Sequence, residues 1–137
     1  MASQLKVDTI TGVTTAGSIA VTGEGNSTTT NLQQGLAKSW ISYESVGTVA
    51  IRDSFNSAGL TDNGTGDLSH TVTNAMGNVN YSHVGSAGHG DASMIAVMQQ
   101  YDLAAPTTTV SRYQTCYANN NKYDPLSVNI ALLGDLA

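Results

Sequence analysis

The chain has 137 residues, of which only 11% are charged, and a formal net charge of −5. Its five basic residues are dispersed along the sequence, which argues against nucleic-acid binding because that function needs a basic face. The single cysteine, Cys116, excludes an intrachain disulfide and a cysteine-based zinc site, and no apolar run has the length of a membrane span, so no membrane insertion is expected.

We interpret the N-terminal part of the chain as an arm. Residues 4–10 alternate between polar and apolar side chains, which predicts a half-buried strand, and residues 18–22 predict a second short strand. Two strands of this length cannot bury an apolar face alone, so they need another chain or another part of this one. We therefore predict that residues 1–29 form an attachment and oligomerisation arm that ends in a Gly- and Thr-rich linker. The predicted attachment contacts are the apolar side chains of this arm, Leu5, Val7 and Ile10.

We interpret the rest of the chain, residues 30–137, as a β-rich head. One or two helical turns are expected over residues 31–37, and the rest consists of short β-prone runs between Gly, Asn, Asp and Pro turn signals. Strands are predicted over residues 39–43, 48–51, 59–61, 68–73, 78–84, 93–101, 107–117 and 126–133. This pattern predicts an all-β fold, namely an antiparallel β-sandwich of jelly-roll-like form with an extended N-terminal arm.

The clearest turn signal is the run Asp62-Asn63-Gly64-Thr65-Gly66-Asp67, which lies between two β-prone segments and predicts a β-hairpin. Its faint likeness to a calcium loop lacks the ligand spacing of an EF-hand. The chain has one Trp and one Phe, and bulky aromatic side chains dominate the energetics of small cores. The predicted core centre is therefore Trp40 and Phe55, together with Val128 and Ile130 from the last alternating run.

No motif of a catalytic nucleophile, zinc protease or phosphate-binding loop is present, so no catalytic residue, cofactor or enzymatic activity is expected. His83 and His89 flank a glycine-rich loop predicted over residues 85–91, and they are weak metal-ligand candidates whose alternative is simple solvated histidines. His70 shares a face with Leu68 and Val72, which favours a satisfied core or interface histidine.

Polar loops with aromatic residues at the ends of the predicted strands are typical of recognition surfaces. Simple solvated turns have the same composition, so this interpretation has an equal alternative. The candidate receptor-facing residues are Tyr81, His89, Asp91, Asn120 and Tyr123.

Two segments resemble virion proteins of tailed phages. Residues 4–10, with the sequence QLKVDTI, resemble the N-terminal opening of many tail-fibre and virion structural proteins of phages of marine bacteria and cyanobacteria. Residues 35–67, from GLAKSWI through GTVAIRDSFN to LTDNGTGD, resemble a module near the C-termini of such fibres. The chain departs from this family in having His70 at an apolar position and only a short linker in place of a long shaft.

The resemblance implies a homotrimeric virion structural protein that is assembled in the host cytoplasm. Its arm would contact other virion proteins of the tail or capsid, and its head would face a host surface glycan or protein. The first expectation is a short tail-fibre-like appendage for host attachment. A capsid decoration, cement or head-fibre protein is the alternative, and an enzyme such as a glycan hydrolase is the third possibility.

Overall fold

The computed structural model describes residues 5–12, 19–22, 29–88, 96–100, 104–117 and 119–137. The chain divides into two compact units, Met1–Leu36 and Ala37–Ala137, which we call the N-terminal unit and the head. This division lies later than the boundary expected after residue 29. The reason is that strand β2 (Thr29–Asn31) pairs with strand β1 (Ala20–Thr22), and the single helical turn α1 (Leu32–Gly35) follows directly.

The N-terminal unit holds one small antiparallel pair of strands, in which Ala20 lies opposite Asn31. The backbone N–H of Leu32 donates to the carbonyl oxygen of Ile19 at 2.8 Å and joins α1 to this pair. Residues 5–12 contain no strand, so the strand predicted over residues 4–10 is wrong for its described part. An extended segment becomes a strand only by pairing, and this one has no neighbouring strand in the described chain. No described helix is long and apolar enough to span a membrane.

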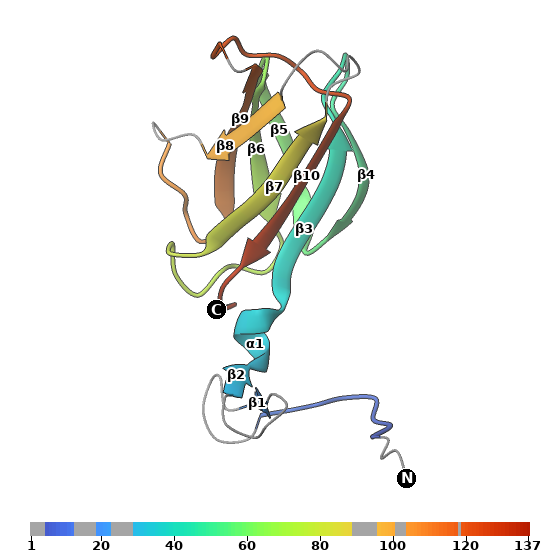
Figure 1. Cartoon of the computed structure of the whole chain (residues 1–137), viewed down its shortest axis with the longest axis vertical. Coiled ribbons are helices and arrows are strands. Elements are labelled where there is room, and N and C mark those ends of the chain that lie inside the picture. The colour runs from blue at the N-terminus through green and yellow to red at the C-terminus, as the bar shows by residue number, and fades with distance from the viewer. Residues whose placement is uncertain (1–4, 13–18, 23–28, 89–95, 101–103, 118) are drawn as a thin grey trace. The chain divides into compact units, whose positions relative to one another are not determined.

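The head is an antiparallel β-sandwich, which confirms the predicted all-β fold class (Figure 1). One sheet has the order β4 (Ala50–Phe55), β3 (Ala37–Glu44), β10 (Ser127–Leu133) and β7 (Ser82–Gly88). The other has the order β5 (Ser57–Gly64), β6 (Asp67–Val72), β9 (Val110–Tyr117) and β8 (Ala96–Gln100). Each sheet therefore has an inner face toward the other sheet and an outer face.

Strand β7 begins and ends later than expected. Gly85 to Gly88 were predicted to open a loop, but they lie along β10, where Gly85 is opposite Ile130 and Gly88 is opposite Ser127. The backbone hydrogen bonds of this pairing outweigh the weak strand propensity of glycine and serine. The predicted glycine-rich loop is thus, in its described part, the second half of a strand.

The core lies between the two sheets and follows the alternation of each strand. Strand β10 contributes Val128, Ile130 and Leu132, which are 0–2% exposed, so the two core residues predicted from this strand are correct. Strand β3 contributes Ile41 and Tyr43. The opposing sheet supplies Leu68, Val72 and Tyr113, and the segment between β6 and β7 adds Met76 and Tyr81.

The prediction that Trp40 and Phe55 form the centre of this core is wrong. Trp40 is 37% exposed and Phe55 is 53% exposed. Side chains alternate between the two faces of a strand, and Ile41 and Tyr43 point inward, so Trp40 must point outward. Phe55 lies directly opposite Trp40 on β4 and shares its outer face.

Candidate functional site

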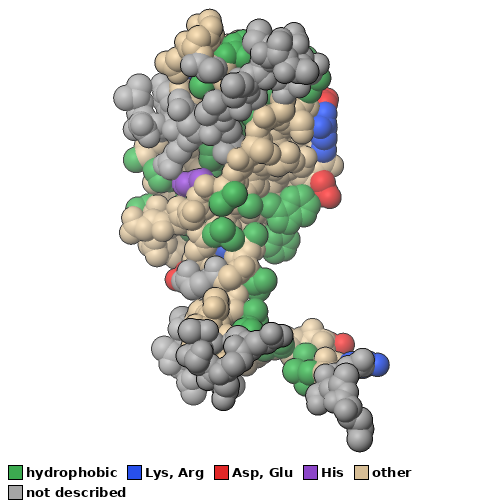
Figure 2. Space-filling model, viewed as in Figure 1, with side chains coloured by type: hydrophobic (Ala, Val, Ile, Leu, Met, Phe, Trp, Pro, Cys, Tyr) green, Lys and Arg blue, Asp and Glu red, His purple; other side chains and the backbone are tan. Residues whose placement is uncertain are grey.

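The outer face of the sheet β4-β3-β10-β7 carries a row of apolar side chains that crosses all four strands. Trp40 is paired with Phe55 on one side and with Ala131 on the other, and Ala131 is paired with Val84. Phe55 and Val84 are each more than half exposed. Figure 2 shows hydrophobic side chains gathered over this part of the sheet. Cross-strand neighbours lie within side-chain contact distance, so the register itself assembles this row.

A polar row runs beside the apolar one, two residues away on each strand. Ser42 is paired with Asp53 and with Asn129, and Asn129 is paired with Ser86. The side chains of Ser42, Ser86 and Asn129 have no hydrogen-bonding partner among the residues that the structure describes. Their hydroxyl and amide groups are therefore free to bind a ligand.

A hollow of about 440 Å³ lies between these rows. This volume falls within the range of ordinary ligand sites, which are mostly apolar with a few polar groups. No charged side chain contributes to its lining, which consists of Trp40, Ile41, Ser42, Val84, Gly85, Ser86, Asn129, Ile130 and Ala131. We call this hollow the aromatic groove. It is the candidate binding site of the head.

Since Trp40 lies on the outer face, its replacement should have only a moderate effect on stability. We expect Trp40→Ala to lower the free energy of unfolding by about 1.5 kcal/mol, because the side chain is only partly buried on the outer face. The neighbouring Ile41→Ala, at a position only 1% exposed, should cost about 3 kcal/mol. Urea denaturation of both variants tests this order. A larger loss for Trp40→Ala than for Ile41→Ala would contradict the outward placement.

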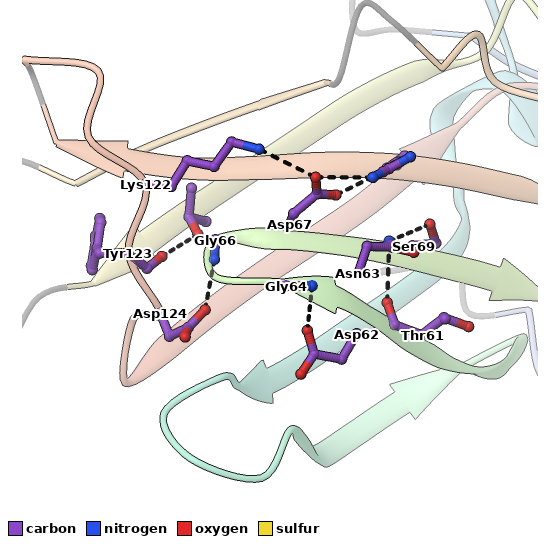
Figure 3. Close-up of polar contacts among 12 residues, drawn as sticks. Thr61, Asp62, Asn63, Gly64, Gly66, Asp67, Ser69, Lys122, Tyr123 and Asp124 are labelled. Atoms are coloured by element: carbon purple, nitrogen blue, oxygen red, sulfur yellow. Dashed lines mark hydrogen bonds and ion pairs between the residues drawn. The ribbon is translucent and has the colours of Figure 1, made fainter.

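The turn between β5 and β6 is held by side chains from distant parts of the chain (Figure 3). Gly64 pairs with Asp67, which confirms the predicted hairpin and places Thr65 and Gly66 at its tip. Asp62 Oδ1 accepts a hydrogen bond from the N–H of Gly64 at 2.8 Å. Asp124 Oδ1 accepts one from the N–H of Gly66 at 2.7 Å.

Asp67 anchors the same turn through a nearly buried carboxylate, whose side chain is 6% exposed. Arg112 Nε lies 2.7 Å from Asp67 Oδ1, and Lys122 Nζ lies 3.3 Å from Asp67 Oδ2. The hydrogen bond from Arg112 is the main reason that the pKa of Asp67 lies below its usual value. The run from Asp62 to Asp67 thus stabilises a hairpin. Its two acidic side chains make the hydrogen bond and the ion pairs that hold this turn.

The weak metal candidates do not form a metal site in the described structure. His83 is half-buried between the rings of Tyr81 and Tyr113, with centroid separations of 4.8 and 5.6 Å, and its Nε2 lies 3.3 Å from Ser111 Oγ. No group of three potential ligands occurs among the described residues. His89 lies outside the described residues.

Two of the predicted receptor-facing residues point into the head instead. The Tyr81 hydroxyl donates to the carbonyl oxygen of Thr107 at 2.8 Å, and Tyr123 is buried and stacks on Tyr117 with ring centroids 4.2 Å apart. Both predictions are therefore wrong, because both side chains are buried, at 8% and 7% exposure. Asn120 is exposed, and Asp91 lies, like His89, outside the described residues.

His70 is completely buried on the inner face of β6. Its Nε2 lies 3.0 Å from Ser57 Oγ, but its Nδ1 has no partner among the described residues, so the histidine is satisfied at one nitrogen only. Desolvation lowers the pKa of His70 from 6.5 to about 4, and the ring is neutral at physiological pH.

The three predicted contact residues of the N-terminal unit are available for a partner. Leu5 is 82% exposed, and Val7 and Ile10 are each more than half exposed. Whether a virion protein covers them stays a prediction.

No family model, no curated protein and no solved structure matches this chain.

The sequence analysis did not predict the aromatic groove, although one signal for it was present. Trp40 is out of phase with Ile41 and Tyr43, so the alternation places it on the opposite face of the strand from those two residues.

Proposed function

We propose that this chain is a structural protein of a tailed-phage virion, a short trimeric tail-fibre-like appendage that takes part in host attachment. Its N-terminal unit would bind other virion proteins, and its head would be displayed toward the host. The resemblance of residues 4–10 and 35–67 to phage fibre proteins supports this proposal. A binding role without catalysis is consistent with the outer-face groove, whose lining carries no ionisable group.

The observation that carries the proposal is the exposure of apolar side chains in the N-terminal unit. Leu5, Val7, Ile10 and Val21 each leave more than half of their surface in water. The head has its own separate core between two sheets. Exposed apolar groups of this kind gain about 25 cal/mol for each Å² that a partner covers. The N-terminal unit therefore has the chemistry of an attachment segment.

Replacing the three apolar contacts tests this role. We expect the triple variant Leu5→Ser, Val7→Ser, Ile10→Ser to fold its head normally but to lose incorporation into virions at least tenfold, because the apolar contact area is gone. The measurement is the amount of the protein in purified particles, by quantitative mass spectrometry. The matched control, Lys6→Ser with Asp8→Ser, changes exposed polar neighbours and should be incorporated normally. Equal incorporation of the triple variant and the control would refute attachment through these side chains.

A capsid decoration or cement protein is the second candidate, and it is favoured by the direct passage from the N-terminal unit to the head at residues 36 and 37. A fibre with a long shaft would need many residues between them. Copy number separates the two roles, since a tail appendage is present in a few trimers per particle and a capsid decoration in scores.

A further inference from the structure

We propose that the aromatic groove binds an uncharged carbohydrate chain of the host surface. The host as the source of this ligand rests on the proposed function, whereas the ligand class is argued from the groove itself. The site is built by three neighbouring strands of one sheet, and its residues come from β3, β7 and β10. Sites on packed strands hold their geometry better than sites on loops.

The lining of the groove matches the two kinds of surface that a sugar ring presents. The apolar C–H faces of a sugar can pack on an indole and on aliphatic groups, here Trp40, Val84 and Ala131. Its hydroxyl groups need hydrogen-bonding partners at the edges of the ring. Ser42, Ser86 and Asn129 offer hydroxyl and amide groups that no other described residue engages.

Charge determines which carbohydrates fit. The lining is free of charge, and the charged residue in the neighbouring polar row is Asp53, opposite Ser42. Arg52, on the same edge strand, is already engaged: its Nη2 lies 2.8 Å from Glu44 Oε2 and donates to the carbonyl oxygen of Leu126 at 2.7 Å. An acidic polymer would meet the Asp53 carboxylate with no free cation nearby in the described head. A neutral chain can instead donate hydroxyl hydrogens to that carboxylate.

A second copy of this chain is a less fitting occupant of the groove. A dry contact between two such faces would cover the polar row together with the apolar one. Burying the side chains of Ser42 and Asn129 without partners, and the Asp53 carboxylate without a counter-ion, would cost free energy. A polyhydroxylated ligand supplies those partners.

The test uses the single tryptophan of the chain, which lies in the groove and reports binding by its fluorescence. The full chain is titrated with neutral oligomers of glucose, mannose, galactose and N-acetylglucosamine, and with acidic alginate oligomers. We expect a saturable change with at least one neutral oligomer, at a Kd of about 1 mM or tighter, and none with alginate. No response to any neutral oligomer, or an equal response to alginate, would overturn the assignment.

Two exposed asparagines provide a matched pair of variants. Asn129→Ala should weaken the binding of the responding oligomer at least fivefold, whereas Asn80→Ala, outside the groove, should bind normally. Unchanged binding in Asn129→Ala would overturn the placement of the site. Light scattering on Trp40→Ala gives a further check: if this variant loses the oligomeric state of the parent, the face is a subunit interface and the proposal fails.

The result of this binding test is independent of the test of the proposed virion role. Oligosaccharide binding is measured on the isolated chain and does not depend on incorporation into particles. A chain that binds a neutral oligomer but is absent from virions would keep the groove assignment and refute the virion role. A chain that is incorporated into virions but binds no neutral oligomer would refute only the groove assignment.

Discussion

Gly66→Ala is expected to destabilise the head by about 4 kcal/mol, the largest effect that we expect of a single substitution. Gly66 has a φ of 62°, in the left-handed region where side chains are disfavoured. A Cβ atom at this position would collide with the carbonyl oxygen of Thr115 and lie 2.9 Å from the backbone N and O of Tyr123. These are backbone atoms of the packed fold and cannot move aside cheaply.

The same substitution would also disturb the hydrogen bonds that hold the turn. The N–H of Gly66 donates to Asp124 Oδ1, and the carbonyl oxygen of Gly66 accepts from the N–H of Thr115 at 2.9 Å. The measurement is the urea midpoint with an unchanged m-value. Gly88→Ala is the matched control, because its nearest neighbour, Ser127, would be 3.7 Å from the new Cβ. If Gly66→Ala were as stable as Gly88→Ala, the described turn geometry would be incorrect.

Acidification is expected to remove roughly 3 kcal/mol of stability between neutral pH and pH 4, chiefly through His70. The folded state holds this buried ring neutral and lowers its pKa from 6.5 to about 4. The unfolded chain therefore binds a proton first as the pH falls, so the stabilisation is complete above pH 6.5 and is lost toward pH 4. Protonation would place a positive charge on a buried ring whose Nδ1 has no partner among the described residues.

Two other titrating groups also lower the stability of the head as the pH falls, but their contributions can be distinguished from that of His70. Burial also lowers the pKa of His83, whereas the lowered pKa of Asp67 affects stability only in more acidic solution, below its ordinary value of 3.8. The measurement is the denaturation midpoint as a function of pH. His70→Leu should flatten the profile between pH 6.5 and pH 4, and His83→Gln should leave most of it. A parent protein with a constant midpoint over this window would contradict the buried, neutral His70.

Some features of the head follow from local patterns alone. The strict alternation in residues 126–133 predicted a strand with Val128 and Ile130 inside, and both are in the core. The run from Asp62 to Asp67 predicted the β5–β6 hairpin. Both patterns act through neighbours in sequence, because strand alternation and turn conformation depend on adjacent residues.

Other predictions failed where the decision depended on distant residues. The strand of residues 39–43 has two faces, and its sequence does not say which one the second sheet will cover. The bulk of Trp40 favoured the inside, but the face with Ile41 and Tyr43 is the one that meets Leu68 and Tyr113. Tyr81 was expected to face a receptor, and its hydroxyl instead donates to the carbonyl oxygen of Thr107, 26 residues away in the sequence.

The sequence by itself determined the class of fold, because alternation and turn residues specify antiparallel strands one segment at a time. Only the tertiary structure decided the register that sets Trp40 beside Phe55 and Ala131, and Ala131 beside Val84, and so produced the aromatic groove. The physical reason is that strand register is fixed by the sum of packing and hydrogen bonds over whole sheets. No single segment carries that information.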